Sequence, residues 1–161
     1  MLPLLGLFFS SPVVAKELQD TPIGIGINTW YTYDAPCLSV RYVLPTNSIA
    51  AMQDVQIQVE GLLGTSIAPS TRSSGIIGGR ILSAVVIEDN LNILAGAGVG
   101  LGVINKTTVF QLQPSMEAQY FLFGLENLSF SSGLGVNITL GTGENSVATA
   151  GSVFGGFNYW F

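Results

Sequence analysis

Histidine is absent from the 161-residue chain. Imidazole is the side chain that most often serves as a general base or a metal ligand near neutral pH. Its absence argues against most hydrolytic and metal-dependent chemistry, so we expect a protein that is not an enzyme and that holds no metal or cofactor. A Ser–Lys or paired-carboxylate site stays formally open, but no spacing in the sequence supports one.

Charged residues are also scarce. They make up 9% of the chain, whereas hydrophobic residues make up 48%, and the mean hydropathy is +0.52. A soluble domain usually carries about 25% charged residues, so this composition indicates a membrane protein. The net charge of −5 comes without any basic cluster, which argues against a nucleic-acid partner.

Long apolar runs are missing as well, apart from the first fifteen positions. A spanning helix needs about 20 consecutive apolar residues. The other structure that satisfies its backbone within lipid is a closed β-barrel. The single cysteine, Cys37, cannot form an intramolecular disulfide and lies in no CxxC motif, so we interpret it as a residue without a chemical role.

Residues 1–15 read MLPLLGLFFSSPVVA and are predicted to be a cleaved signal peptide, with residues 16–161 forming the mature barrel domain. The apolar stretch over residues 2–9 has the length of a signal-peptide core, and small residues precede the expected cleavage point after Ala15. An N-terminal strand or a membrane anchor is the alternative interpretation. A signal peptide implies export, which suits a barrel.

The remaining chain divides into stretches in which apolar residues alternate with small or polar ones, the pattern of half-buried strands. This predicts an all-β fold, a closed antiparallel eight-stranded up-and-down transmembrane β-barrel. The eight predicted strands cover residues 23–31, 38–44, 49–63, 75–87, 91–104, 109–123, 128–140 and 147–161. In the sixth, Pro114 falls on the apolar face, which indicates a bulge.

The predicted connections alternate in length. Tight polar turns are expected at residues 45–48, 88–90 and 124–127, with looser connections at residues 32–37, 64–74, 105–108 and 141–146. Outer-membrane barrels have short periplasmic turns and longer external loops. An even strand number then places both termini on the periplasmic side.

The charged residues indicate which face meets lipid. A soluble barrel of the lipocalin kind turns its apolar face inward, and a membrane barrel turns it outward. Only five charged residues fall inside predicted strands, and each lies on the polar face: Arg41, Asp54, Glu60, Arg80 and Glu117. Five charges cannot solvate the outside of eight strands, but a polar lumen needs only a few.

Hairpin geometry predicts that some of these charges meet. Centring each hairpin on its turn sets Glu60 opposite Arg80, Arg80 opposite Gly98, and Gly98 near Glu117. Glu60, Arg80 and Glu117 would then share one level of the lumen. An arginine between two carboxylates is neutralised and hydrogen-bonded. We interpret the cluster as a structural plug, with a charge gate or a solute site as the alternative.

The last strand ends in an aromatic row, Phe157, Tyr159 and Phe161. This ending resembles the C-terminal assembly signal of bacterial outer-membrane proteins, which the barrel-assembly machinery binds. The whole mature chain resembles the small eight-stranded barrels, similar to the transmembrane domain of outer-membrane protein A and its short relatives. The resemblance implies the outer membrane of a Gram-negative-type bacterium, contact with its lipid and lipopolysaccharide, and a charged lumen network, here Arg41, Glu60, Arg80 and Glu117.

Two functions therefore suit the sequence. The first is a structural or surface-interaction barrel with a plugged lumen, in which residues 64–74 form the main external contact surface for a partner that the sequence does not identify. The alternative is a narrow porin-like channel for small solutes or ions, since glycines on the polar face of residues 91–104 would leave space in the lumen. Eight strands normally enclose an interior that side chains just fill, which favours the first.

Overall fold

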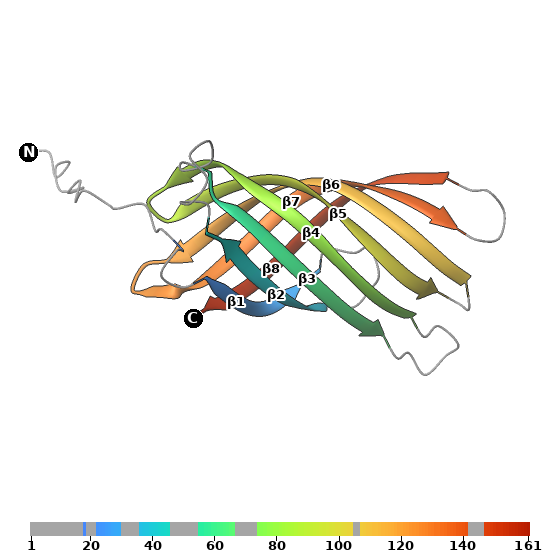
Figure 1. Ribbon diagram of the computed structural model, residues 1–161, viewed down its shortest axis with the longest axis horizontal. Coiled ribbons are helices and arrows are strands. Elements are labelled where there is room, and N and C mark those ends of the chain that lie inside the picture. Colours follow the sequence, from blue (N-terminus) through green and yellow to red (C-terminus); the bar gives the residue numbers. More distant parts are fainter. Residues whose placement is uncertain are drawn as a thin grey trace, which may run out of the picture.

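The computed structural model describes residues 18, 22–29, 36–45, 55–66, 74–104, 107–141 and 147–161. Eight antiparallel strands, each paired with its neighbours in the chain, form a closed barrel (Figure 1). They are β1 (Ile23–Asn28), β2 (Cys37–Leu44), β3 (Ile57–Ser66), β4 (Ser74–Glu88), β5 (Leu91–Ile104), β6 (Thr107–Leu122), β7 (Leu125–Gly141) and β8 (Val147–Trp160). The predicted all-β closed antiparallel barrel, its strand number and its up-and-down order are confirmed.

The barrel closes where β1 pairs with β8, with Ile25 opposite Tyr159. Backbone hydrogen bonds extend this seam at both ends: the Phe161 amide donates to the Ile23 carbonyl over 2.8 Å, and the Thr29 amide donates to the Gly155 carbonyl over 2.9 Å. The start of β1 and the end of β8 therefore lie together, at the end of the barrel that carries the C mark in Figure 1. We call this the terminus-side end and the opposite one the loop-side end.

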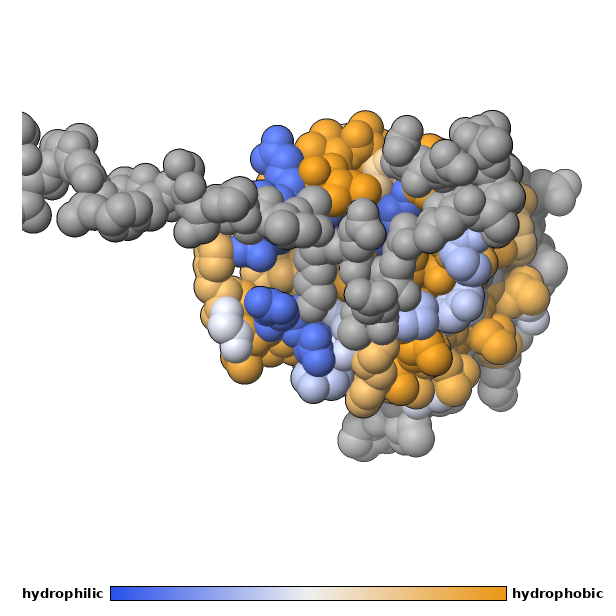
Figure 2. All heavy atoms as spheres, turned by 60° about the vertical axis from the view of Figure 1, so that its left-hand side comes forward, coloured by the Kyte–Doolittle hydropathy of each residue, from blue (hydrophilic) through white to orange (hydrophobic). Residues whose placement is uncertain are grey.

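The wall of the barrel is apolar outside and polar inside. Along β2 and β6, buried inward residues alternate with exposed outward ones in strict sequence. Buried polar residues line the lumen on every strand, and large exposed hydrophobic residues line the outside. Figure 2 shows this apolar wall, with hydrophilic residues near the terminus-side rim. No helix among the described residues is long and apolar enough to cross a membrane.

The lumen is filled in successive layers, which the pairing of β6 with β7 orders. Phe121 opposite Ser129 is nearest the terminus-side end, followed by Gln119 opposite Ser131 and then Glu117 opposite Gly133. Phe121 belongs to an apolar cluster with Leu18, Val43 and Trp160. A second apolar cluster lies toward the loop-side end and consists of Cys37, Leu62, Ile76 and Phe154. Polar and charged side chains occupy the level between these clusters, together with the buried Leu82 and Leu94.

Several predicted connections were misplaced. Leu44 pairs with Ile57, so β2 and β3 are joined by residues 45–56 and the tight turn predicted at 45–48 is wrong. The predicted and the observed registers of β2 and β3 keep the same residues facing outward, so alternation alone does not choose between them. The observed register additionally sets Arg41 opposite Glu60. Asp54 lies outside the described residues, as do Trp30, Tyr31 and residues 1–15.

The strands also reach further into the predicted loops than expected. β3 continues to Ser66, β6 already begins at Thr107, and β7 begins at Leu125 and ends at Gly141. Cys37 is the first residue of β2 rather than part of a loop. The turn predicted at 124–127 is a tight turn at Phe123 and Gly124, where Gly124 supplies a φ of 79° that other residues rarely adopt.

The bulge predicted at Pro114 is wrong. Pro114 pairs with Ala97 without a shift of register, and it faces outward. The registers shift instead between Ala84 and Val86 on β4, and between Phe121 and Leu122 on β6. Both shifts lie near the terminus-side hairpin tips. The rims of barrels are a common place for such irregularities.

The β1–β8 seam requires glycine at Gly26, because a Cβ there would lie 1.8 Å from the Phe157 carbonyl oxygen. We expect Gly26→Val to prevent closure or to destabilise the barrel by about 1–3 kcal/mol or more. Unboiled samples in detergent gels should lose the shifted band of the folded barrel. Gly61→Val is the matched control, since a Cβ at Gly61 meets nothing within 4 Å. If both variants keep the folded band equally, the seam does not depend on this close approach.

Candidate functional site

Four charged side chains form a closed ring of ion pairs at the middle of the lumen. Arg41 Nη1 lies 2.6 Å from Glu117 Oε1, and Arg80 Nη2 lies 2.6 Å from Glu117 Oε2. Arg41 Nε lies 3.2 Å from Glu60 Oε1, and Arg80 Nε pairs with Glu60 Oε2. Each guanidinium thus contacts both carboxylates. All four side chains are fully shielded from solvent.

The register of three neighbouring strands positions most of this ring. Arg41 on β2 lies directly opposite Glu60 on β3, and Glu60 lies directly opposite Arg80 on β4. The next residue in this row is Gly98 on β5, which has no side chain to separate Arg80 from β6. Glu117 on β6 lies outside this row, opposite Leu94, and contacts both arginines across the lumen.

Neutral groups complete the coordination of Glu60. The Ser39 hydroxyl donates to Glu60 Oε1, and the Asn28 amide donates to the same oxygen over 3.3 Å. The Ser39 hydroxyl also lies 3.2 Å from Asn158 Oδ1, which connects the ring to β8. Charge-assisted hydrogen bonds of this kind are about twice as strong as neutral ones.

The Phe154 ring covers the loop-side face of Arg80. The guanidinium carbon of Arg80 lies 5.2 Å from the ring centroid, within the range of a cation–π contact. Phe154 occupies the space that a side chain at residue 133 would need, because a Cβ on Gly133 would lie 2.3 Å from Phe154 Cζ. An inward glycine on β7 thus makes room for an aromatic ring from β8.

A layer of amides lies between the ring and the terminus-side apolar cluster. Gln58 donates to Gln119 Oε1 over 3.1 Å, and Gln119 in turn lies 3.4 Å from the Ser129 hydroxyl. The Ser129 hydroxyl also accepts a 2.8 Å hydrogen bond from Trp160 Nε1. Hydrogen bonds therefore run from the polar interior to the indole that caps it.

The chemistry of the ring suits structural closure. Its two positive and two negative charges cancel, and each charged group is held by partners of opposite sign. Burying such charges is tolerable only when they are paired and hydrogen-bonded. No group of three or more His, Cys, Asp or Glu residues that would suit a metal ion occurs among the described residues.

The structure partly matches the predicted charge cluster. Glu60 opposite Arg80 and Arg80 opposite Gly98 are confirmed. Gly98 near Glu117 is wrong, because Gly98 pairs with Gln113 and Glu117 pairs with Leu94. Thr107 and Thr108 belong to β6 instead of a loop, which shifts the whole hairpin. Glu117 still joins Arg80 through the reach of the long arginine side chain.

Two inward aromatic residues of β8 fill the lumen; alternation in the sequence already places Trp160 on the polar face of the last strand, whereas Phe154 was not assigned to a face. Trp160 and Phe154 face the lumen, between the outward residues of β8. Their positions follow from alternation with Phe157, Tyr159 and Phe161, which the structure places on the outer face. The sequence signal is the glycine that pairs with each of them, because a glycine leaves space for a large side chain on the neighbouring strand. Gly24 pairs with Trp160, and Gly133 pairs with Phe154.

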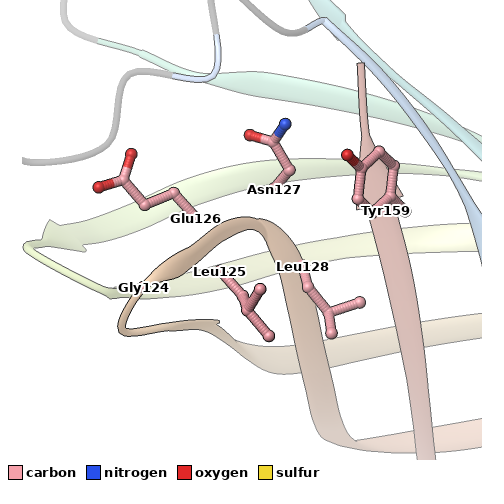
Figure 3. A pocket seen from close by; sticks show the side chains of 6 residues that line it. All are labelled: Gly124, Leu125, Glu126, Asn127, Leu128 and Tyr159. Carbon is pink, nitrogen blue, oxygen red and sulfur yellow. The ribbon is translucent and has the colours of Figure 1, made fainter.

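A shallow hollow lies outside the lumen, at the tip of the β6–β7 hairpin. It measures about 410 Å³ and is lined by Gly124, Leu125, Glu126, Asn127, Leu128 and Tyr159 (Figure 3). Glu126 was expected in a turn and instead lies in β7. Leu128 pairs with Tyr159, so these two side chains share one face of the sheet, and the close-up shows Leu125 and Leu128 pointing away from Glu126 and Asn127. This set offers no nucleophile–base pair.

Comparisons with known proteins return no match: the chain fits no family model, and none of the curated proteins or solved structures is significantly similar to it. Fold and site chemistry therefore carry the functional argument.

Removing one member of the ring should be costly. Arg80→Ala leaves Glu60 and Glu117 with Arg41 as their shared cation, so we expect a loss of about 3–5 kcal/mol in the free energy of unfolding. Denaturant titration of the folded barrel measures this. Ser131→Ala, a buried lumen substitution outside the ring, should cost less than about 1 kcal/mol.

A double variant tests whether the four residues act as a unit. Adding Glu117→Ala to Arg80→Ala leaves the neutral Arg41–Glu60 pair, so the second substitution should cost much less than Glu117→Ala alone. Strictly additive effects would show that the ring does not exist as a coupled network.

Proposed function

We propose that the protein is an integral outer-membrane β-barrel with a polar, plugged lumen and a structural or surface-interaction role. The observation that carries this proposal is the inverted distribution of polarity. Arg41, Glu60, Arg80 and Glu117 are buried inside, while apolar side chains such as Leu134, which is 65% exposed, cover the outside. In water such a wall would be a very large exposed apolar patch, whereas lipid is its natural solvent.

Aromatic side chains mark one edge of the apolar wall. Five exposed ones lie within strands near the terminus-side end, with Phe123 and Phe161 just beyond the strand ends: Tyr42, Tyr120, Phe130, Phe157 and Tyr159. Exposed Glu88, Asp89 and Glu126 lie beyond them at the hairpin tips. Aromatic rings concentrate at membrane interfaces and charged residues outside them. This sequence of layers supports an interface at the terminus-side end, which we assign to the periplasm.

The proposed lipid partners are outer-membrane lipid and lipopolysaccharide. The outer wall near the loop-side end has an apolar hollow of about 480 Å³ around Gly75, between Leu63, Ile77 and Val103. Thr65 and Thr108 border it. A smooth hollow in an apolar wall suits flexible hydrocarbon chains, and the connections at that end would face the cell exterior and any surface partner.

The barrel-assembly machinery is the proposed partner during insertion. Phe157, Tyr159 and Phe161 project outward from or just beyond β8, and β8 pairs with the short first strand through only part of its length. A strand with an exposed aromatic row and a limited closing seam suits recognition before the barrel closes.

A charge on the wall distinguishes a membrane from an aqueous surround. Leu134→Lys places an ammonium near the level of the charge ring, so we expect a loss of about 2–4 kcal/mol in vesicles. On a water-exposed surface the same substitution would change stability by less than about 0.5 kcal/mol. Unfolding in urea, followed by gel migration of unboiled samples, measures the difference.

Thr108→Lys is the matched control for this experiment, because Thr108 is exposed and is the second residue of β6, at the loop-side end. A lysine near the interface costs only about 0–1 kcal/mol. Equal stability of both variants and the parent protein would contradict the membrane proposal.

The same proposal predicts an electrically silent barrel. The charge ring and the two apolar clusters occupy successive levels of the lumen. We expect planar-bilayer recordings to show no discrete conductance steps over many insertions verified by protein content. Regular steps of one amplitude would favour the porin-like channel instead.

A further inference from the structure

Leu18 is the one described residue that precedes β1 and its flanking Pro22, and it is completely buried. It belongs to no strand, yet it packs in the apolar cluster with Val43 of β2, Phe121 of β6 and Trp160 of β8. These strands contribute side chains to the cluster from different sides of the barrel. A residue from outside the wall therefore lies among inward side chains at the terminus-side end of the lumen.

The surroundings of Leu18 are held in place by contacts of their own. The Val43 amide donates to the Pro22 carbonyl over 2.8 Å, which fixes the chain shortly after Leu18 against β2. The Trp160 indole donates to Ser129, and its ring lies 3.0 Å from where a Cβ on Gly24 would be. The Phe121 and Trp160 rings are 6.4 Å apart. Leu18 thus completes a preformed apolar seat.

The position of this seat shows which part of the lumen it shields from water. It lies directly next to the layer of Gln58, Gln119 and Ser129, in which side-chain amides and hydroxyls form hydrogen bonds. Water would readily solvate that layer, and an apolar constriction excludes water and ions by dewetting. The seat is the last layer before the terminus-side mouth, so its integrity controls access to the polar interior from that side.

We propose that the Leu18 side chain is a stopper that closes the terminus-side mouth of the lumen. The other three residues of the cluster belong to strands of the wall, whereas Leu18 belongs to no strand. Removal of the Leu18 side chain would open the amide layer to water while leaving strand pairing and the charge ring intact. The inference depends on the barrel alone and does not rest on the membrane location proposed above.

Thiol accessibility tests the stopper. Ser131→Cys places a reporter in the amide layer, opposite Gln119 and one layer inside Phe121 and Ser129, in a Cys37→Ala background that removes the native thiol. The barrel is folded in detergent and treated with a charged methanethiosulfonate reagent. With Leu18 present, we expect slow modification. Leu18→Ala should raise the rate at least about tenfold, since a large apolar side chain no longer fills the seat.

Two further variants decide the interpretation. Leu18→Met retains apolar volume and should keep the slow rate, and Leu38→Ala removes an outward leucine of β2 and should also leave it unchanged. Gel migration of unboiled samples shows that each variant is folded. An unchanged rate in Leu18→Ala overturns the proposal. Fast modification with Leu18 present also overturns it, as does an equal increase in Leu38→Ala, which would indicate general loosening.

Discussion

The width of an eight-stranded barrel is the constraint on which the other features depend. Eight strands enclose a space that side chains just fill, so every inward residue must fit its neighbours across the lumen. Because this interior is polar, its groups must also satisfy one another. The ring of Arg41, Glu60, Arg80 and Glu117 meets both demands, since two long cations and two carboxylates from four strands fill the centre and neutralise each other.

The inward glycines are the counterpart of these large side chains. Gly24 accommodates Trp160, Gly133 accommodates Phe154, and Gly98 pairs with Arg80. An inward glycine therefore does not by itself leave a void, because a large side chain from a neighbouring strand can occupy its space, as Phe154 does at Gly133. Side chains from all the strands fill the lumen together. The residues of one strand therefore do not show how much of the lumen is empty.

The sequence was sufficient for the fold because the relevant signal is local. Period-two alternation and the position of each in-strand charge define the strands, their order and the face of Arg80 or Glu117. Register was less predictable, since a shift by two residues keeps every face unchanged. The short polar hairpin at Glu88–Leu91 allowed the register of β4 against β5 to be predicted correctly. The connection after Leu44 did not allow this for β2 against β3. Packing of Leu18 was unpredictable because it lies outside the alternating pattern.

The neutrality of the charge ring has a consequence for how the lumen can respond to its surroundings. A membrane potential does work on a group in proportion to the net charge that moves. The two arginines and two glutamates sum to zero, so a field would pull equally in both directions on the ring as a unit. If the barrel spans a membrane as proposed, a voltage would therefore exert no net force on the ring as a unit.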